Sequence, residues 1–365
     1  MKFECSMEQF LPAVSLAARF VQKQSGLPVL GCILMIAEGS EVLLRATNLE
    51  CGAEVVVPAK VSEGGTAAIS GNVLLGFLSN VRGKSITVAL NEGTVRFSAD
   101  RASASIKTIP HEDFPALPRV PAEKMFSLKA SDLAKTLRSV LHCASVSNIK
   151  PELQSILLSG DAGKLFAAAT DSFRLAEKQA PLKSRGGIPN LLLPARNAAE
   201  LIRILESAKN EVEVYYNENQ LSVQVGGVYY TSRLLDGAFP NYRQIVPTQS
   251  TTEAVILRED FAQALKGLSI FSDKFLQVTF EVDAKEKVVK LSSRNADVGE
   301  QESVLKAAVS GESIKMSFNS KYLGDSLLPI SGESVRLQLN GPGRPMLIKD
   351  SSDDSYFYIA MPMNR

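Results

Sequence analysis

The sequence has 365 residues, of which 45% are hydrophobic and 22% are charged, and its 40 basic and 39 acidic residues leave a formal net charge of +1. A single hydrophobic core stops growing at about 250–300 residues, so we expect more than one domain. The composition excludes a disordered chain and a disulfide-rich miniprotein, and no apolar run approaches the roughly 20 residues of a membrane helix. Because the net charge is close to zero, any surface that attracts nucleic acid must be local.

The cysteines and histidines indicate neither a disulfide framework nor a metal site. Four cysteines lie far apart without a CxxC motif, and the amino end, MKFECSMEQF, lacks the charged and then apolar layout of a signal peptide. Reduced thiols in a cytoplasmic protein are therefore expected. The two histidines have no Cys or His at the spacing of a zinc site, so the sequence predicts neither a metal nor a cofactor.

Each third of the sequence begins with a short strand and an amphipathic helix. In each helix, three apolar residues recur at positions i, i+4 and i+7, which places them on one helical stripe. Their starting positions differ by 123 and 128 residues, far more than the repeat of a solenoid. The stripes are Phe10, Val14 and Ala17 in the first third, Leu133, Leu137 and Val140 in the second, and Phe261, Leu265 and Leu268 in the third.

The rest of each third follows the same order. ATNLECGAEV from Ala46 matches ATDSFRLAEK from Ala169 and, more loosely, SRNADVGEQE from Ser293. A second helix is predicted near residues 71–82, 196–208 and 320–329, followed by a hairpin whose turn contains NEGT, NENQ or NGPG. The junctions HEDFPALPRVP and GAFPNYRQIVP are rich in proline. These repeats predict three α+β domains, at residues 1–120, 121–247 and 248–365.

Residue patterns for bond-breaking chemistry are incomplete. His142 and Cys143 are adjacent on a predicted helix, where neighbouring side chains do not face each other. The segment Gly83–Ser85 resembles the end of a phosphate-binding loop, but Leu78 occupies the position of the required first glycine. The sequence therefore predicts a protein without catalytic residues.

Basic side chains on the predicted helices permit two interpretations. Lys135 and Arg138 share one helical face, and Arg196 and Arg203 share another with Glu200 between them. One interpretation is an ordinary solvated face with ion pairs. The other is a sequence-independent surface for phosphates, provided that all the helices point the same way. The residue pattern alone leaves both open.

Three apolar, irregular segments also permit two interpretations. ATDSFRLA contains an expected turn at a strand end, FPNYRQIVP is a linker, and YIAMPMNR contains two methionines beside a proline. Such segments can be ordinary core and strand ends, or they can meet and form an adaptable pocket for a peptide. Only their arrangement in space distinguishes the two.

The threefold unit, together with ATDSFRLA, FPNYRQIVP, KYLGD and the terminal MPM, resembles the bacterial sliding-clamp family, the beta subunits of DNA polymerase III. The resemblance extends over the whole sequence. It implies an α+β fold of three tandem clamp (processivity-fold) domains, and a head-to-tail homodimeric ring with helices inside and sheets outside. It also implies a non-catalytic accessory subunit in the cytoplasm, which encircles double-stranded DNA and tethers the replicative polymerase.

The resemblance implies a pocket for short linear motifs between the second and third domains. The partners would be the replicative polymerase alpha subunit, the clamp loader, and repair and translesion polymerases. Because the sequence contains no ATP site, a separate loader would have to open the ring. By position in the family's motifs, the pocket residues would be Leu153, Thr170, Ser172, Phe173, Arg174, Leu175, Pro240, Ile245, Tyr322, Ile359, Met361, Pro362 and Met363.

The resemblance also turns the helices toward DNA and implies a ring interface between a basic and an acidic edge. The DNA-facing residues would be Arg19, Lys23, Gln24, Arg82, Lys135, Arg138, Arg196, Arg203, Lys266 and Lys321. The dimer interface would contain Arg101, Ile106, Lys107, Ile270, Phe271, Asp297, Glu300 and Glu302.

The sequence departs from the family at some of the pocket positions, and two rival functions are also considered. Phe173 and Gln244 stand where relatives often carry other residues, so we expect an altered motif preference. A clamp-like paralogue or decoy would dimerise and bind motifs without topological loading onto DNA. A metal-dependent nuclease would use Asp171 and Asp236, two carboxylates near the pocket segments.

Overall fold

The computed structural model describes residues 1–22, 26–121, 125–161, 163–184 and 186–363. The chain forms two compact units. The first comprises Met1–Ser131, Lys183–Arg185 and Ala199–Leu234, and the second comprises Asp132–Leu182, Gly186–Ala198 and Leu235–Arg365. Each unit therefore contains part of the middle third of the sequence.

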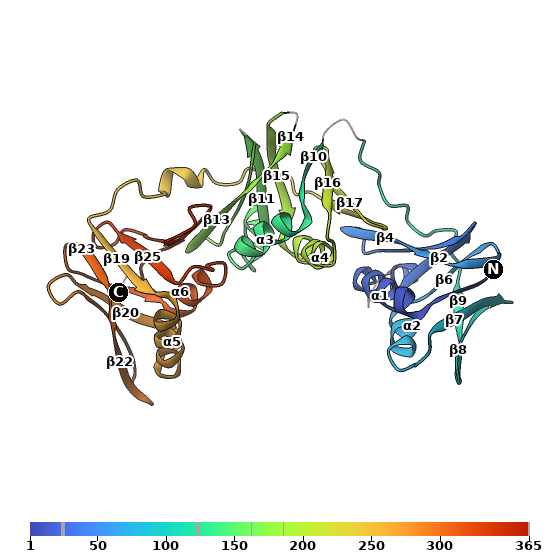
Figure 1. Cartoon of the computed structure of the whole chain (residues 1–365), viewed down its shortest axis with the longest axis horizontal. Coiled ribbons are helices and arrows are strands. Elements are labelled where there is room, and N and C mark those ends of the chain that lie inside the picture. Colours follow the sequence, from blue (N-terminus) through green and yellow to red (C-terminus); the bar gives the residue numbers. More distant parts are fainter. Residues whose placement is uncertain (23–25, 122–124, 162, 185, 364–365) are drawn as a thin grey trace. The chain divides into compact units, whose positions relative to one another are not determined.

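Antiparallel strands of the first unit form one 14-stranded sheet. α1 (Met7–Ala17) and α2 (Gly71–Leu78) lie against each other, and α1 packs on β3 and β4 (Figure 1). The unit also contains the 3-10 helices η1 (Ala18–Phe20) and η2 (Pro28–Gly31), and residues 199–206 of α4 (Ala195–Glu206). The strand order is β14 (Lys183–Ser184), β10 (Met125–Lys129), β16 (Glu211–Tyr216), β17 (Gln220–Val225), β18 (Val228–Arg233), β4 (Cys51–Pro58), β3 (Glu41–Thr47), β2 (Cys32–Glu38), β6 (Gly65–Ser70), β9 (Ala102–Ile109), β8 (Thr94–Ala99), β7 (Ser85–Asn91), β1 (Lys2–Ser6) and β5 (Lys60–Glu63).

The second unit contains a nine-stranded and a four-stranded antiparallel sheet. α5 (Arg258–Leu268) packs against α6 (Ser320–Ser326) and against strands of both sheets (Figure 1). α3 (Ala130–Leu141) and the 3-10 helices η3 (Pro151–Gln154), η4 (Tyr242–Ile245) and η5 (Ser269–Phe271) complete the helical elements. The strand orders are β15 (Ile188–Pro194), β11 (Ser155–Asp161), β12 (Lys164–Thr170), β13 (Arg174–Pro181), β27 (Tyr356–Ala360), β26 (Met346–Asp350), β25 (Ser334–Leu339), β19 (Thr252–Leu257) and β23 (Ala308–Gly311), and β22 (Gly299–Lys306), β21 (Val288–Asn295), β20 (Gln277–Asp283) and β24 (Ile314–Asn319).

The predicted helical stripes and hairpins are confirmed. All nine stripe residues of α1, α3 and α5 are buried, and Phe10, Leu137 and Phe261 have no exposed side-chain surface. Burial of each such side chain stabilises the fold by about 1.5–3 kcal/mol. The hairpins pair β7 with β8, β16 with β17 and β25 with β26. Apolar periodicity was therefore sufficient to place the helical faces, and the turn residues were sufficient to place the hairpins.

The three predicted second helices all extend past the ends of the helices observed. α4 was expected to reach residue 208 and ends at Glu206. α2 was expected to reach residue 82, but it ends at Leu78. The side chains of Ser79 and Asn80 donate to the carbonyl oxygens of Leu75 and Gly76, which ends the helix at this point. Arg82 therefore lies in the loop after α2 and not on the helix. α6 likewise ends at Ser326 instead of residue 329.

The 14-stranded and the nine-stranded sheet each continue from one repeat into the next. In the first unit β4 pairs with β18, from Val55 opposite Val228 to Cys51 opposite Ser232. In the second unit β13 pairs with β27, from Lys178 opposite Tyr356 to Arg174 opposite Ala360. The paired positions are related by the same offsets of 123 and 128 residues as the helical stripes. The two junctions are therefore equivalent in strand register.

Candidate functional site

A pocket of about 140 Å³ lies where the ends of β12 and β27, the start of β13 and the linker around η4 meet. All of these elements belong to the second unit. The structure thus brings ATDSFRLA, FPNYRQIVP and YIAMPMNR together around one cavity. The lining residues are Thr170, Ser172, Arg174, Leu175, Pro240, Asn241, Tyr242, Ile245, Ile359 and Met361.

Five predicted pocket residues do not line this cavity. Leu153 is buried in η3, and Phe173 is 62% exposed beside the turn. Tyr322 is half-buried on α6, and Pro362 and Met363 are half-buried after the end of β27. The cavity therefore contains eight of the predicted residues, and their role in binding a partner stays a prediction.

A tight turn between β12 and β13 shapes one wall of the pocket. The carboxylate of Asp171 accepts hydrogen bonds from the backbone N–H groups of Phe173 and Arg174, each at 3.0 Å. The hydroxyl of Thr170 accepts another from the backbone N–H of Ser172. Ser172 has a φ of 78°, which a residue other than glycine rarely adopts. These bonds hold the turn in its left-handed conformation.

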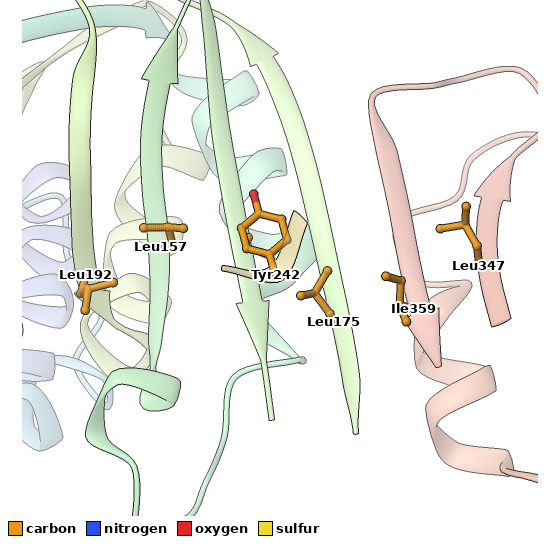
Figure 2. Packing of buried hydrophobic residues seen from close by; sticks show 7 residues of the cluster. Leu157, Leu175, Leu192, Tyr242, Leu347 and Ile359 are labelled. Atoms are coloured by element: carbon orange, nitrogen blue, oxygen red, sulfur yellow. The ribbon is translucent and has the colours of Figure 1, made fainter. Parts of the chain in front are cut away.

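The floor of the pocket is part of a buried apolar cluster. Figure 2 shows Tyr242 of the linker beside Leu175 on β13, with Ile359 on β27 on the other side of Leu175. Leu175 and Ile359 are each 1% exposed. An apolar side chain that entered from outside would therefore meet a preformed apolar surface. The full cluster comprises Leu157, Ala168, Leu175, Leu192, Tyr242, Leu347 and Ile359.

Tyr242 fixes the linker over the strands. Its hydroxyl donates to the carboxylate of Glu177, which is 4% exposed on β13. Burial, and then the hydrogen bond to Glu177, raise the pKa of Tyr242 well above its usual value. A guanidinium nitrogen of Arg243 lies 3.7 Å from the same carboxylate. The buried carboxylate is thus paired, and it determines where the linker crosses the sheet.

Arg174 is the charged group of the pocket wall. Its Nε atom donates to Asp171 at 2.9 Å and its Nη1 atom donates to Asp325 of α6 at 2.5 Å. Its guanidinium also lies 4.4 Å from the ring centre of Tyr322. With a side chain only 10% exposed, Arg174 is held by two carboxylates and an aromatic face.

His142 lies behind this wall, directly after α3. Its ring stacks on that of Tyr358 at 5.9 Å. Among the described residues, the buried Nε2 atom has no hydrogen-bond partner. Burial, and then the charge of Arg174, lower the pKa of His142 to about 4. The imidazole is therefore neutral at pH 7 and adds no second cation beside Arg174.

The predicted DNA-facing residues that the structure describes are all exposed. Lys23 and Gln24 lie outside the described residues. Arg19 forms two hydrogen bonds to Glu200 of α4, and Arg203 lies 3.9 Å from the same carboxylate. Arg19 therefore fits the interpretation of a solvated helical face with ion pairs, because it is both exposed and paired with a carboxylate. The exposed residues are Arg19, Arg82, Lys135, Arg138, Arg196, Arg203, Lys266 and Lys321.

The predicted basic edge lies on β9. This strand pairs with β8 along its length but with β6 only at Thr108 and Ile109. Within the described residues, the other side of Ala102–Lys107 therefore has no strand partner. Arg101 and Lys107 are exposed, whereas Ile106 is 7% exposed and packs within its own unit.

The predicted acidic edge lies on β22, the outer strand of the four-stranded sheet. Glu300 and Glu302 are exposed on this strand, and Asp297 is exposed in the turn before it. Ile270 is 67% exposed in η5, whereas the neighbouring Phe271 is half-buried. In the part of the chain that the structure describes, both strand edges thus lack a strand partner and suit strand addition.

The structure offers little for the nuclease alternative. Asp171 uses both carboxylate oxygens within the turn and on Arg174. Within the described ranges, no three His, Cys, Asp or Glu side chains are grouped so that they could hold a metal ion.

No helix in the described part of the chain is long and apolar enough to span a membrane.

Three family profiles match the chain in succession. They are the N-terminal domain of the DNA polymerase III beta subunit at residues 1–118, its central domain at 127–241 and its C-terminal domain at 243–364. The chain belongs to the DNA polymerase III beta subunit family. The family and the three-domain clamp fold predicted from the sequence are thus confirmed.

Similar proteins span the full length of this beta subunit family member. The beta sliding clamp of Staphylococcus aureus strain Mu50 is 25% identical, over 100% of this chain and 99% of the relative. A Pseudomonas aeruginosa sliding-clamp structure is 25% identical, covers 100% of both chains and has a TM-score of 0.93. The Thermotoga maritima beta subunit, at 23% identity, covers 100% of this chain and 99% of its own, with a TM-score of 0.94.

The pocket of this beta subunit includes residues that the sequence did not indicate. Asn241 and Tyr242 line the cavity but were not among the predicted residues. A signal for Tyr242 exists in the repeats, because FPNY of the second junction aligns with FPAL of the first. Asp325 was visible within KYLGD, but its contact with Arg174 joins residues 151 positions apart.

Proposed function

We propose that the chain is a DNA sliding clamp, a non-catalytic processivity factor that encircles duplex DNA as a homodimeric ring and tethers a polymerase. The observation that carries this proposal is the succession of all three beta subunit domains over residues 1–118, 127–241 and 243–364. A closed ring stays on circular DNA because of its topology, so each phosphate contact can be weak enough to permit sliding. The chain would act in the cytoplasm, and an ATP-dependent loader would open it.

The three proposed clamp domains are residues 1–120, 121–247 and 248–365. The equivalent strand registers at the two junctions support this division. The exposed lysines and arginines of the helices would face the duplex and attract phosphates without reading sequence. Arg19, which is already paired with Glu200, would contribute less than Lys135 or Lys266.

The proposed ring closes by strand addition between two chains. The free side of Ala102–Lys107 on β9 in one chain would pair with β22 of the other. Arg101 and Lys107 would face Asp297, Glu300 and Glu302, so the two edges differ in sign and favour a head-to-tail contact. Ile270 and Phe271 would add apolar surface beside this contact.

The pocket would receive short motifs of the polymerase alpha subunit, the clamp loader, and repair and translesion polymerases. Its buried floor of Leu175 and Ile359 suits an apolar side chain, and Ile245 and Met361 at the rim are partly exposed and adaptable. A Pseudomonas aeruginosa sliding clamp, 25% identical over 100% of both chains with a TM-score of 0.95, binds griselimycin. We expect griselimycin to compete with motif peptides for this pocket.

Retention on circular DNA tests the clamp function. The chain is loaded onto nicked circular DNA by a loader and ATP, the salt concentration is raised, and the circle is then cut once. A ring should stay on the circle and leave the linear form, because only topology resists high salt. Equal loss from both forms would contradict a clamp and favour a decoy that binds motifs without topological loading.

A peptide array tests the pocket separately. Overlapping peptides of the polymerase alpha subunit encoded in the same genome are titrated against the chain by fluorescence anisotropy. At least one should bind, and Leu175→Ala should abolish its binding because the apolar floor is lost. Binding that this substitution leaves unchanged would exclude the pocket as the motif site.

A further inference from the structure

Asp325 of α6 lies between two separate depressions of the second unit. On one side it lines a groove of about 560 Å³ between α5 and α6. Arg258, Lys266 and Lys321 line the same groove, so three cations share it with this carboxylate. The groove is therefore suited to an anion, such as a phosphate of a nucleic acid backbone.

On the other side, Asp325 contacts the wall of the pocket. Its Oδ2 atom accepts the 2.5 Å hydrogen bond from Nη1 of Arg174, and Arg174 lines the pocket. Asp325 is 22% exposed, so this ion pair is screened less than one on the open surface. One carboxylate thus belongs both to the α5–α6 groove and to the support of the pocket.

α6 holds Arg174 at two points. Tyr322 and Asp325 lie at i and i+3 on one helical face, and they meet the face and the edge of the guanidinium. The start of α6 is fixed in turn, because Asn319 accepts hydrogen bonds from the backbone N–H groups of Lys321 and Tyr322. A change in the charge around α6 therefore reaches Arg174 through a short, ordered path.

We propose that Asp325 is a positioning residue that couples the motif pocket to the α5–α6 groove, so that a motif and duplex DNA strengthen each other's binding. This inference rests on the proposed clamp function. An anion in the groove would offset the positive charge of Arg258, Lys266 and Lys321, which line the groove together with Asp325. The charge of Asp325 would then act more strongly on Arg174, its ion-pair partner, and hold it against the pocket turn. By reciprocity, a motif that orders Arg174 increases the affinity of the groove for DNA by the same factor.

The test measures one affinity in two conditions. The probe is the fluorescein-labelled polymerase peptide that binds the parent chain most tightly, titrated with and without a 20-base-pair duplex at low salt. In the parent, DNA should strengthen peptide binding about fivefold. Asp325→Asn should weaken peptide binding roughly tenfold, and DNA should then leave the peptide affinity of this variant unchanged. Asp325→Glu, which restores the charge, should recover part of both effects.

Asp260→Asn is the matched control, because it removes one exposed carboxylate from α5 without a contact to Arg174. It should leave the affinity and the DNA effect unchanged, and thermal melting should show that all variants are folded. Equal peptide affinity in the parent and Asp325→Asn would overturn the positioning role alone. Weaker binding with an unchanged DNA effect would overturn the coupling. A parent chain that binds no peptide would overturn the proposed function as well.

Discussion

The first and second junctions between repeats have the same backbone arrangement but different side chains. Asn48 at the first and Asp171 at the second each accept hydrogen bonds from the backbone N–H groups two and three residues later. The next residues, Leu49 and Ser172, have φ values of 73° and 78°. A side-chain oxygen at this position thus stabilises the same left-handed turn, whether it belongs to an amide or a carboxylate.

The side chains above this turn differ in size. Gly52 at the first junction corresponds to Leu175 at the second. A Cβ atom on Gly52 would lie 2.5 Å from Cδ2 of Leu117, so this linker leucine rests directly on the backbone of β4. At the second junction Leu175 forms an apolar floor, and Tyr242 replaces the linker leucine and reaches Glu177.

The linker anchor, in contrast, is common to both junctions. Glu54 and Glu177 occupy equivalent positions and are each 4% exposed. Glu54 pairs with Arg119 of the first linker, and Glu177 accepts from Tyr242 of the second. A buried carboxylate therefore fastens each linker, whereas the pocket depends on a few substitutions at the second junction. Four substitutions test this comparison, from the largest expected effect to the smallest.

Leu175→Ala should remove the floor of the pocket. Because the leucine is 1% exposed, we expect the free energy of unfolding to fall by about 4 kcal/mol and peptide binding to be lost. Urea denaturation and anisotropy measure the two effects. Leu117→Ala is the control at the first junction, and it should destabilise the fold without a change in peptide affinity. Loss of peptide binding in Leu117→Ala would contradict the assignment of a single pocket.

Gly52→Ala should show that the first junction is filled. The new methyl group would lie 2.5 Å from Leu117 and 2.9 Å from the backbone oxygen of Ala46. We expect a loss of about 3 kcal/mol in urea denaturation. Gly76→Ala on α2 has nothing within 4 Å of its added methyl group and should be neutral or slightly stabilising. Equal stability of the two variants would mean that Leu117 moves aside without cost.

Acid should destabilise the second junction through His142. Its folded pKa of about 4 lies below the usual value near 6.5, so the fold disfavours the protonated ring. The neutral ring therefore contributes fully to the free energy of unfolding above pH 6.5, and this contribution is lost as the pH falls toward 4. Between pH 8 and pH 5 we expect a loss of about 2 kcal/mol that His142→Phe lacks. Parallel stability curves for the parent and the variant would exclude this histidine as the cause.

Asp171→Asn should have the smallest effect, because Asn48 shows that an amide supports the same turn. The substitution removes only the charge that pairs with Arg174, so we expect a loss of about 1 kcal/mol and a modest decrease in peptide affinity. The reciprocal Asn48→Asp meets no arginine in the turn, since Cys51 occupies the equivalent position, and should change stability less. A collapse of the fold in Asp171→Asn would show that the turn itself requires the carboxylate.

Local patterns were sufficient for the fold and for part of the site. Periodicity placed the apolar faces of α1, α3 and α5, and turn residues placed the hairpins. The C-terminal end of α2 was missed because the side chains of Ser79 and Asn80 donate to backbone carbonyl groups, which depends on rotamers and not on hydrophobic pattern. The predicted domain boundaries stay a prediction.

Contacts between distant segments could not be derived from periodicity. Arg19 pairs with Glu200, which lies 181 residues away, and Arg174 pairs with Asp325, which lies 151 residues away. The pocket residues of the three segments were found through the family resemblance, while Tyr242 was overlooked because an aromatic linker residue also fits ordinary core. Charge neutralisation and cavity lining depend on the tertiary arrangement, so both require the structure.

The pairing of β13 with β27 has a consequence for biosynthesis. β13 begins at Arg174, but its partner strand is Tyr356–Ala360, so its edge stays open while the intervening chain is translated. Synthesis at about 5–20 residues per second leaves this edge exposed for roughly ten seconds or more. During this interval the floor of the pocket lacks Ile359, and a chaperone or another nascent chain can reach the open strand. A chain interrupted before residue 356 would therefore lack the strand that carries Ile359 and would have no finished pocket.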